Sequence, residues 1–277
     1  MKDSAEQAQI ESATAYESLF VPALFEQWTV QVADAAGIQP GQRVLDVACG
    51  TGVLARHVGR RIGTGGRVTG LDPSAGMLAV ADRHAPAVDW RRGTAESLPF
   101  DAGSFDAVVS QFGLMFFTDR ARAVREMMRV LTPGGRLAVA VWDSLENNPA
   151  FAAEVDLLTR LAGRAPADAV RAPFMLGDRQ VLAKVFGDAG VRPIDITTHA
   201  GVARFPNMRV VLEADLRGWL PRVGLPQSEE TIDRVLAAAD QALGSHVSQV
   251  DGGVEFDLSV HIVSAKKSAR ATARSSS

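Results

Sequence analysis

The fold is decided by residues 43–52, RVLDVACGTG, which are followed directly by VLARHVGRRIG. Residues 43–48 form an apolar, β-branched run of strand length. In the segment that follows, apolar residues recur at helical spacing: Leu54, Val58 and Ile62. We therefore expect a strand, a glycine turn and a helix. Gly50 and Gly52 permit positive φ angles and leave room for a ligand against the backbone, where the free amides of the helix point outward.

An acidic residue precedes this turn and indicates the kind of ligand that could bind there. Asp46 is predicted at the carboxyl end of the strand, where open α/β sheets bind ligands. A carboxylate there suits a cationic or hydroxyl-bearing ligand better than a phosphate. Starting at Gly50, the chain also reads GTGVLA, which satisfies the dinucleotide fingerprint G-x-G-x-x-G/A. A nucleotide-binding turn of another kind is therefore left open by this stretch alone.

Composition sets the broad class of the protein. The 277 residues are 47% apolar and 22% charged with a formal net charge of −3, so a nucleic-acid partner is not expected. Cys49 is the single cysteine and has no partner for a disulfide or a zinc site, which favours a cytoplasmic protein without a metal. No apolar run reaches membrane-spanning length, and the polar amino terminus differs from a secretory signal.

A second strand is predicted at residues 67–72, after the first helix, and it ends in Asp72. An acidic residue about twenty residues after a glycine turn is what recognition of the ribose hydroxyl groups requires. Its carboxylate would accept hydrogen bonds from both hydroxyls and would repel a 2′-phosphate. The alternative role of Asp72 is to cap the next helix, although Ser74 is itself a good N-cap.

Further strands are expected to end at the same edge of the sheet. After the third strand, the amide of Ala95 and the carboxylate of Glu96 could pair with the edge of an adenine ring. Gln111 follows the fourth strand, predicted at residues 105–110, and falls on the ligand side. A helix follows with one predicted apolar face: Ala121, Val124, Met128 and Leu131. With a fifth strand at residues 136–142, this succession implies a parallel, doubly wound α/β sheet.

The regular alternation of strands and helices stops after residue 142. We expect a helix at residues 147–162, then a loop to residue 173, a short helix, a strand within residues 191–205, and helices between residues 206 and 246 that cover the sheet. The predicted division has four parts: an amino-terminal helical segment (1–37), a Rossmann-like core (38–145), a helical cover with the last strands (146–264) and a disordered basic tail (265–277).

Four motifs in order resemble the class I S-adenosylmethionine-dependent methyltransferases, in particular the ubiquinone and menaquinone biosynthesis C-methyltransferases. They are VLDVACGTG, VTGLDPSAGML, GTAESLPFDAGSFDAVVSQFGLMFF and REMMRVLTPGGRLAVAVW, and they span about residues 40–142. The resemblance implies a mostly parallel seven-stranded sheet with a final antiparallel strand at residues 254–263. It also implies S-adenosylmethionine as cofactor, S-adenosylhomocysteine as product and a small aromatic or lipid-like acceptor.

The resemblance also assigns roles to single residues. The implied cofactor-binding set is Asp46, Ala48, Gly50, Gly52, Asp72, Met77, Ala95, Glu96 and Gln111. Aromatic rings are suited to flank a cationic centre, and the predicted substrate-binding residues are Phe116, Phe117 and Trp142. Asp143 is expected on the same side as Trp142. No catalytic base can be assigned, and His246 in the cover is the weak candidate.

Three possible functions remain once this resemblance is taken into account. Methyl transfer is preferred, because the glycine turn is preceded by an acidic residue and the GTAESLPF loop has no equivalent duty in hydride transfer. The alternatives are an S-adenosylmethionine-binding protein without methyl transfer and an NAD-dependent oxidoreductase. Whether the protein forms a homodimer is left open.

Overall fold

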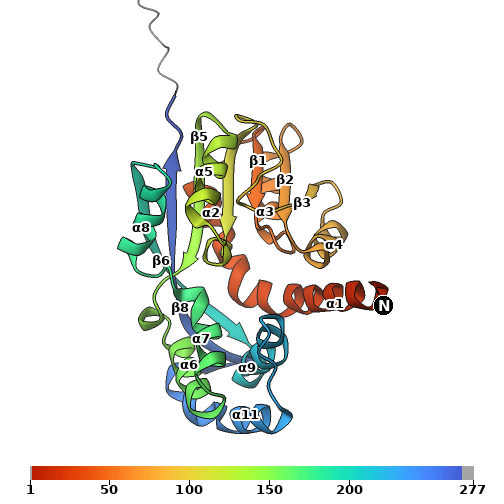
Figure 1. Cartoon of the computed structure of the whole chain (residues 1–277), viewed down its shortest axis with the longest axis vertical. Helices are drawn as coiled ribbons and strands as arrows, with labels where there is room; N and C mark the ends of the chain where they lie inside the picture. Colours follow the sequence, from red (N-terminus) through yellow and green to blue (C-terminus); the bar gives the residue numbers. More distant parts are fainter. Residues whose placement is uncertain (1, 270–277) are drawn as a thin grey trace, which may run out of the picture. The chain divides into compact units, whose positions relative to one another are not determined.

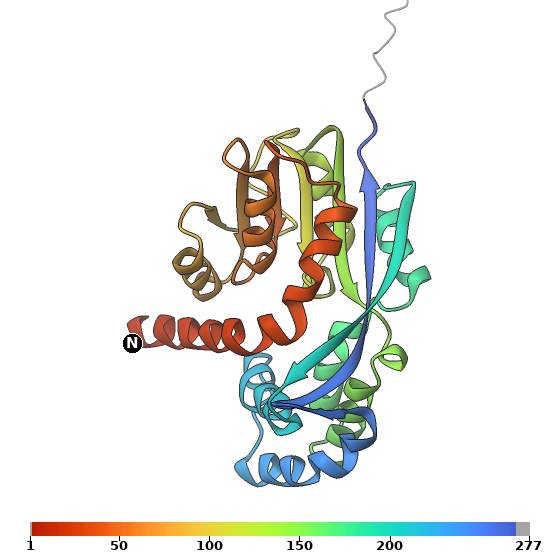
Figure 2. The same cartoon turned by 180° about the vertical axis from the view of Figure 1, so that it is seen from behind.

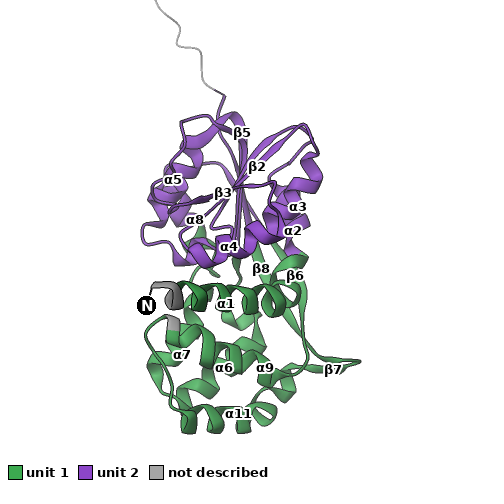
Figure 3. Ribbon diagram, turned by 90° about the vertical axis from the view of Figure 1, so that its right-hand side faces the viewer, with its two compact units in different colours: residues 1–27, 141–182, 198–261 green, residues 28–140, 183–197, 262–277 purple. Residues whose placement is uncertain are grey.

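The computed structural model describes the backbone of residues 2–269, with side chains from residue 6 onward except residue 222 (Figure 1). The chain falls into two compact units (Figure 3). Unit 1 holds the residues up to 27 together with 141–182 and 198–261, and unit 2 holds 28–140, 183–197 and the residues from 262 onward. No helix in the described chain is both long and apolar enough to cross a membrane.

The described strands form one eight-stranded sheet in the order β3-β2-β1-β4-β5-β8-β6, and β7 pairs with β8. Their bounds are β1 (Arg43–Val47), β2 (Arg67–Asp72), β3 (Asp89–Arg92), β4 (Phe105–Gln111), β5 (Leu131–Trp142), β6 (Ile194–Phe205), β7 (Ser248–Val250) and β8 (Gly253–Lys266). The first five strands pair in parallel. This confirms the predicted fold class, and the sheet has one short antiparallel strand, β7, beyond the seven expected.

The described helices alternate with the strands in the first half of the chain and follow one another in the second. They are α1 (Lys2–Phe20), α2 (Thr29–Ala35), α3 (Val53–Ile62), α4 (Ala75–His84), α5 (Arg120–Val130), α6 (Pro149–Leu161), α7 (Arg164–Arg171), α8 (Arg179–Asp188), α9 (Met208–Ala214), α10 (Leu220–Arg222) and α11 (Glu229–Leu243). In unit 2, α2 and α3 cover one face of the strands and α5 covers the other (Figures 2 and 3).

The core of unit 2 explains the strand and helix patterns. Val44 of β1 and Val109 of β4 are fully buried with Val32 of α2 and Val58 of α3 in one apolar cluster. The expected buried stripe of α3 is confirmed. Burying side chains of this size contributes about 1.5–3 kcal/mol each. The strand order reverses between the parallel strands β1 and β4: β2 and β3 follow on one side of β1, and β4 and β5 lie on the other. Such a switch point is where doubly wound sheets bind their ligands, at the carboxyl ends of the strands.

Two predictions about helices were wrong. The apolar face of α5 consists of Ala123, Val124, Met127 and Val130 rather than the predicted set. The helix ends at Val130 and Leu131 begins β5, so a stripe counted back from Leu131 was out of register. The segment predicted as a loop before residue 173 contains α7. Its Pro166 is compatible with a helix because it lies in the first turn.

The carboxyl terminus also differs from the prediction at one point. The strand expected at residues 254–263 is confirmed but β8 continues to Lys266, inside the segment predicted as a tail. The ammonium of Lys267 then donates to the carbonyl oxygens of Arg129 and Leu131 at 2.9 and 2.6 Å. The remainder of the predicted tail, residues 270–277, lies outside the described residues.

Candidate functional site in unit 2

The turn after β1 contains three residues with left-handed backbone. Ala48, Gly50 and Gly52 have φ angles of 58°, 54° and 86°. The amide of Gly52 donates to the carbonyl of Cys49 at 2.9 Å, and α3 begins at the next residue. A Cβ added at Gly50 would meet no atom within 4 Å, so space remains beside the backbone there. The turn therefore has the open backbone surface that the sequence predicted.

Asp72, the last residue of β2, fastens this turn to the neighbouring strand. One carboxylate oxygen accepts the amide of Gly50 at 2.9 Å, and the other accepts the amide of Ser74 at 2.9 Å. The N-cap of α4 is Ser74, whose hydroxyl oxygen accepts the amide of Met77. The helix is thus capped by Ser74 and not by Asp72. Because each carboxylate oxygen can accept more than one hydrogen bond, Asp72 keeps the capacity to bind hydroxyl groups.

Asp46, the second acidic strand end, lies in a very different environment. Its side chain is 1% exposed, and neither carboxylate oxygen has a hydrogen-bond partner at good geometry among the described residues. Burial raises the pKa of Asp46 to about 8, the charge of Asp72 adds to this rise, and the amide of Ala55 opposes it. The carboxylate form of Asp46 is therefore poorly stabilised without a cation nearby.

The remaining predicted cofactor residues lie in unit 2, at or after the carboxyl ends of its strands. Ala95 is buried in the connection after β3, Gln111 is the half-buried last residue of β4, and Met77 is half-buried in the first turn of α4. The carboxylate of Glu96 accepts the amide of Thr118 at 2.8 Å. Glu96 thus ties the loop after β3 to the segment after β4, a role that the sequence did not indicate.

Two buried hydroxyl groups near this turn were not predicted. Thr51 is 1% exposed and Ser110 is fully buried, and neither hydroxyl oxygen has a hydrogen-bond partner in the described part of the chain. Ser110 follows three apolar residues of β4, Ala107, Val108 and Val109, and a small polar residue after such a run is the signal that could have identified it. Buried polar groups without partners are rare in folded proteins and mark positions where a ligand or water completes the hydrogen bonds.

The residues predicted for the acceptor fall in both units. Phe116 is 53% exposed and Phe117 is half-buried, and both follow β4 in unit 2. Trp142 belongs to unit 1, where its ring lies 6.1 Å from that of Phe25 and 6.0 Å from that of Phe174. His246 is exposed at the end of the helical segment that follows α11.

Asp143 of unit 1 belongs to a buried cluster of hydrogen-bonded polar side chains. One carboxylate oxygen accepts the hydroxyl of Ser259 at 2.7 Å, and the other lies 3.1 Å from Nε2 of His261. The other ring nitrogen of His261 lies 2.9 Å from the hydroxyl of Thr198. The hydrogen bonds from Ser259 and Asn147 hold the pKa of Asp143 below its usual value despite its burial. This network joins β5, β6 and β8, which gives Asp143 and His261 a structural role.

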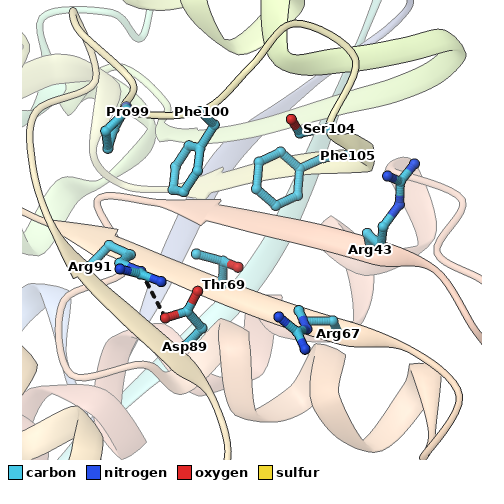
Figure 4. Close-up of a pocket in the computed structure, with 9 residues that line it drawn as sticks. All are labelled: Arg43, Arg67, Thr69, Asp89, Arg91, Pro99, Phe100, Ser104 and Phe105. Atoms are coloured by element: carbon cyan, nitrogen blue, oxygen red, sulfur yellow. Dashed lines mark ion pairs between the residues drawn. The ribbon is translucent and has the colours of Figure 1, made fainter.

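A pocket of about 370 Å³ lies at the opposite edge of the unit 2 sheet (Figure 4). Arg43 and Arg67 begin β1 and β2, and Asp89 begins β3. Arg91 pairs with Asp89 at 2.8 Å, and Arg43 pairs with Asp106 at 2.8 Å. Because doubly wound sheets bind ligands at the carboxyl ends of their strands, this pocket is distinct from the site around Asp46 and Asp72. No group of three or more His, Cys, Asp or Glu side chains suited to a metal ion occurs among the described residues.

The left-handed turn and the two acidic strand ends lie together at the switch point of a doubly wound sheet, and known proteins share this part of the chain. Residues 45–139 match the family described as "Methyltransferase domain". This segment runs from within β1 to within β5 and contains every predicted cofactor residue. The match confirms, for the part of the chain that it covers, the class inferred from the four sequence motifs.

The similar curated proteins are named as methyltransferases of a quinone or of quinone biosynthesis. The chain is 46% identical over 114 residues to a demethylmenaquinone methyltransferase of Renibacterium salmoninarum, which covers 41% of this chain and 47% of that protein. It is 37% identical over 146 residues to a ubiquinone/menaquinone biosynthesis C-methyltransferase of Hahella chejuensis, covering 50% and 57%. The chain thus spans about half the length of these relatives, and the similarity supports the predicted branch.

Solved structures share the fold at low sequence identity. The geranyl diphosphate C-methyltransferase of Streptomyces coelicolor superposes with a TM-score of 0.51 at 18% identity, covering 88% of this chain and 76% of that chain. The [4+2]-cyclase SpnF superposes with a TM-score of 0.53 at 22% identity, covering 89% and 82%. Since one of these is named a cyclase, the fold alone does not decide the reaction.

Proposed function

We propose that the protein is an S-adenosylmethionine-dependent methyltransferase whose acceptor is a small aromatic, quinone-like molecule. The observation that carries the proposal is the link between Asp72 and the amide of Gly50, which places an acidic strand end beside an open glycine turn. The methyltransferase-domain match over residues 45–139 and the quinone methyltransferases among its relatives support it.

The residues of the site fit this cofactor. Asp46 is a buried acid whose carboxylate oxygens have no hydrogen-bond partner at good geometry among the described residues, and a ligand with cationic groups would stabilise its charged form. The open side of Gly50 admits a ligand against the backbone. Asp72 would accept the ribose hydroxyls and Ala95 would border the adenine ring. Met77 and Gln111 would complete the site at the adenine and amino acid ends.

When bound, the cofactor supplies an electrophilic sulfonium methyl group, so the reaction needs neither a metal nor a covalent nucleophile from the protein. The chain's own contribution is to hold the donor and the acceptor in line and to exclude water. Holding two reactants in a near-attack geometry removes about 7–11 kcal/mol from a bimolecular barrier. Phe116 and Phe117, which follow β4, are proposed to flank the acceptor.

An acceptor that is a phenol or an activated carbon must also lose a proton. Asp143 and His261 are engaged by the buried cluster of unit 1, which argues against either as the base. His246 remains the weak candidate from the sequence, and the substrate role of Trp142 also stays a prediction. A cytoplasmic location, the absence of a nucleic-acid partner and a homodimer stay predictions as well.

Equilibrium dialysis with labelled S-adenosylmethionine tests the proposal first, with NAD as competitor. We expect saturable retention of the label that S-adenosylhomocysteine displaces and NAD does not. Incubation with reduced naphthoquinones, benzoquinones and simple phenols then tests transfer, with methylated product detected by mass spectrometry. Retention without any product would favour the binding protein that lacks transfer, and displacement by NAD would favour the oxidoreductase.

A further inference from the structure

Trp90 of β3 lies against the backbone of two glycines that belong to different elements. It is the register partner of Gly70 in the neighbouring strand β2. A Cβ added at Gly70 would lie 2.3 Å from Cζ3 of the indole ring. A Cβ added at Gly52 would lie 2.5 Å from Cη2, at the far edge of the same ring. The indole ring therefore fills the space that a side chain would need at both positions.

The position of the ring is fixed from the other side as well. The indole Nε1 of Trp90 donates to the carbonyl oxygen of Ala85 at 3.0 Å, immediately after α4 ends. The half-buried side chain also packs against the apolar cluster that contains α2 and α3. A planar ring held by a hydrogen bond at one edge and by the core at its face has little freedom to move.

The contact with Gly52 reaches the functional turn directly. Gly52 is the left-handed residue before α3, and it lies two residues after Gly50, whose amide donates to Asp72. Because Gly52 has no side chain, its backbone lies directly on the indole ring. A shorter side chain at position 90 would leave an empty space behind the turn, into which the backbone could relax.

We propose that Trp90 is a positioning residue for the cofactor turn: its ring holds the backbone at Gly52 in the position that binding of S-adenosylmethionine requires. This inference rests on the proposed function, since it concerns the same ligand. The effect is transmitted through the backbone of Gly52 and needs no contact between Trp90 and the ligand.

The test compares Trp90→Phe with Trp219→Phe. Trp219 is a matched control, because it is also half-buried and its Nε1 also donates to a backbone carbonyl, that of Ala169 at 3.1 Å, but it lies in unit 1. Phenylalanine at position 90 loses the ring edge that touches Gly52. We expect the Kd for S-adenosylhomocysteine, measured by calorimetry, to rise about three- to tenfold in Trp90→Phe, the contribution of about one hydrogen bond, and to stay unchanged in Trp219→Phe.

Two further readouts separate positioning from general stability. With an accepted substrate, KM for S-adenosylmethionine should rise in Trp90→Phe while kcat at saturation changes less than about twofold, since only the turn is displaced. Tryptophan emission should change when S-adenosylhomocysteine binds to the wild type and to Trp219→Phe, and this change should be lost in Trp90→Phe.

Gly70→Ala perturbs the ring without altering Trp90. Its added Cβ must push the indole away, so we expect a similar loss of affinity for S-adenosylhomocysteine. When Gly70→Ala is made in Trp90→Ala, where the indole is absent, we expect no further loss. Unchanged affinity in folded Trp90→Phe, or in folded Gly70→Ala, overturns the inference. If the wild type itself fails to bind S-adenosylhomocysteine, the proposed function fails instead.

Discussion

Replacing Gly113 by alanine tests the contact between the turn after β1 and the segment after β4. A Cβ at Gly113 would lie 2.6 Å from the Cβ of Ala48, about 1 Å closer than an ordinary contact between carbon atoms. The φ angle of Gly113 is −98°, so alanine at this position brings no backbone strain of its own. Overpacking of this kind costs about 1–3 kcal/mol of the free energy of unfolding.

The partner in this contact, Ala48, carries a strain of its own. Its φ angle of 58° is left-handed, which costs a residue other than glycine about 1–2 kcal/mol. Ala48→Gly removes this strain, and the greater freedom of glycine in the unfolded chain offsets about 0.4–1 kcal/mol of the gain. The same substitution removes the methyl group that a new Cβ at position 113 would meet. The neighbours that remain, Ser110 at 3.1 Å and Phe117 at 3.3 Å, need to move by only a few tenths of an ångström.

A double-mutant cycle measured by urea denaturation isolates the contact. We expect Gly113→Ala to lower the free energy of unfolding by about 1–3 kcal/mol in the wild type and by less than about 1 kcal/mol in Ala48→Gly. The resulting coupling energy is about 1–2 kcal/mol. Additive effects, within about 0.5 kcal/mol, would show that these two residues are not in contact and would refute the geometry of the turn.

Three further predictions follow from single features of the structure. Binding of S-adenosylmethionine at about pH 6.5 should release about one proton, because burial raises the pKa of Asp46 to about 8 and a cationic ligand favours its carboxylate. Calorimetry in two buffers of different ionisation enthalpy measures this release. The same release in Asp46→Asn would contradict the prediction. Burial raises the pKa of Glu154 well above its usual value and that of its neighbour Asp215 to about 6, so the native protein holds protons that the unfolded chain has lost. The stability contributed by this pair should be full below about pH 4 and lost as the pH rises through about 6. The midpoint of urea denaturation, measured between about pH 4 and 8, should therefore fall less steeply with pH in Glu154→Gln than in the wild type. An equal slope in the two proteins would count against this role of the pair. Gly52→Ala should lower the free energy of unfolding by about 1–3 kcal/mol more than Gly134→Ala, because the two φ angles, 86° and 83°, are alike but only the first added Cβ would meet a ring. Equal losses in urea denaturation would exclude the contact with Trp90.

The sequence predicted the features that depend on neighbouring residues. The strand, turn and helix around Gly50 and Gly52 follow from short-range periodicity and the conformational freedom of glycine, and Ser74 follows from its capping chemistry. The placement of Asp46 and Asp72 at one edge follows from the rule that parallel strands end on the same side. These parts needed no knowledge of distant contacts.

The sequence missed what depends on residues far apart in the chain. Glu96 accepts an amide from Thr118, so its carboxylate serves the loop rather than only a ligand, and nothing local signals this pairing. Trp90 lies against Gly52, which comes two strands earlier in the chain, and could not be linked to the turn by spacing alone. The rotated face of α5 had a local cause, since the helix ends one residue before Leu131.

A crystal structure of the protein with S-adenosylhomocysteine tests the account most directly, because it locates the ligand independently of activity. We predict that the ribose hydroxyls lie within hydrogen-bond distance of the Asp72 carboxylate, that the adenine ring borders Ala95, and that the amino acid end lies along Gly50. A ligand found instead in the arginine-lined pocket at the opposite edge of the sheet (Figure 4), or no ligand at saturating concentration, would contradict the assignment of the site.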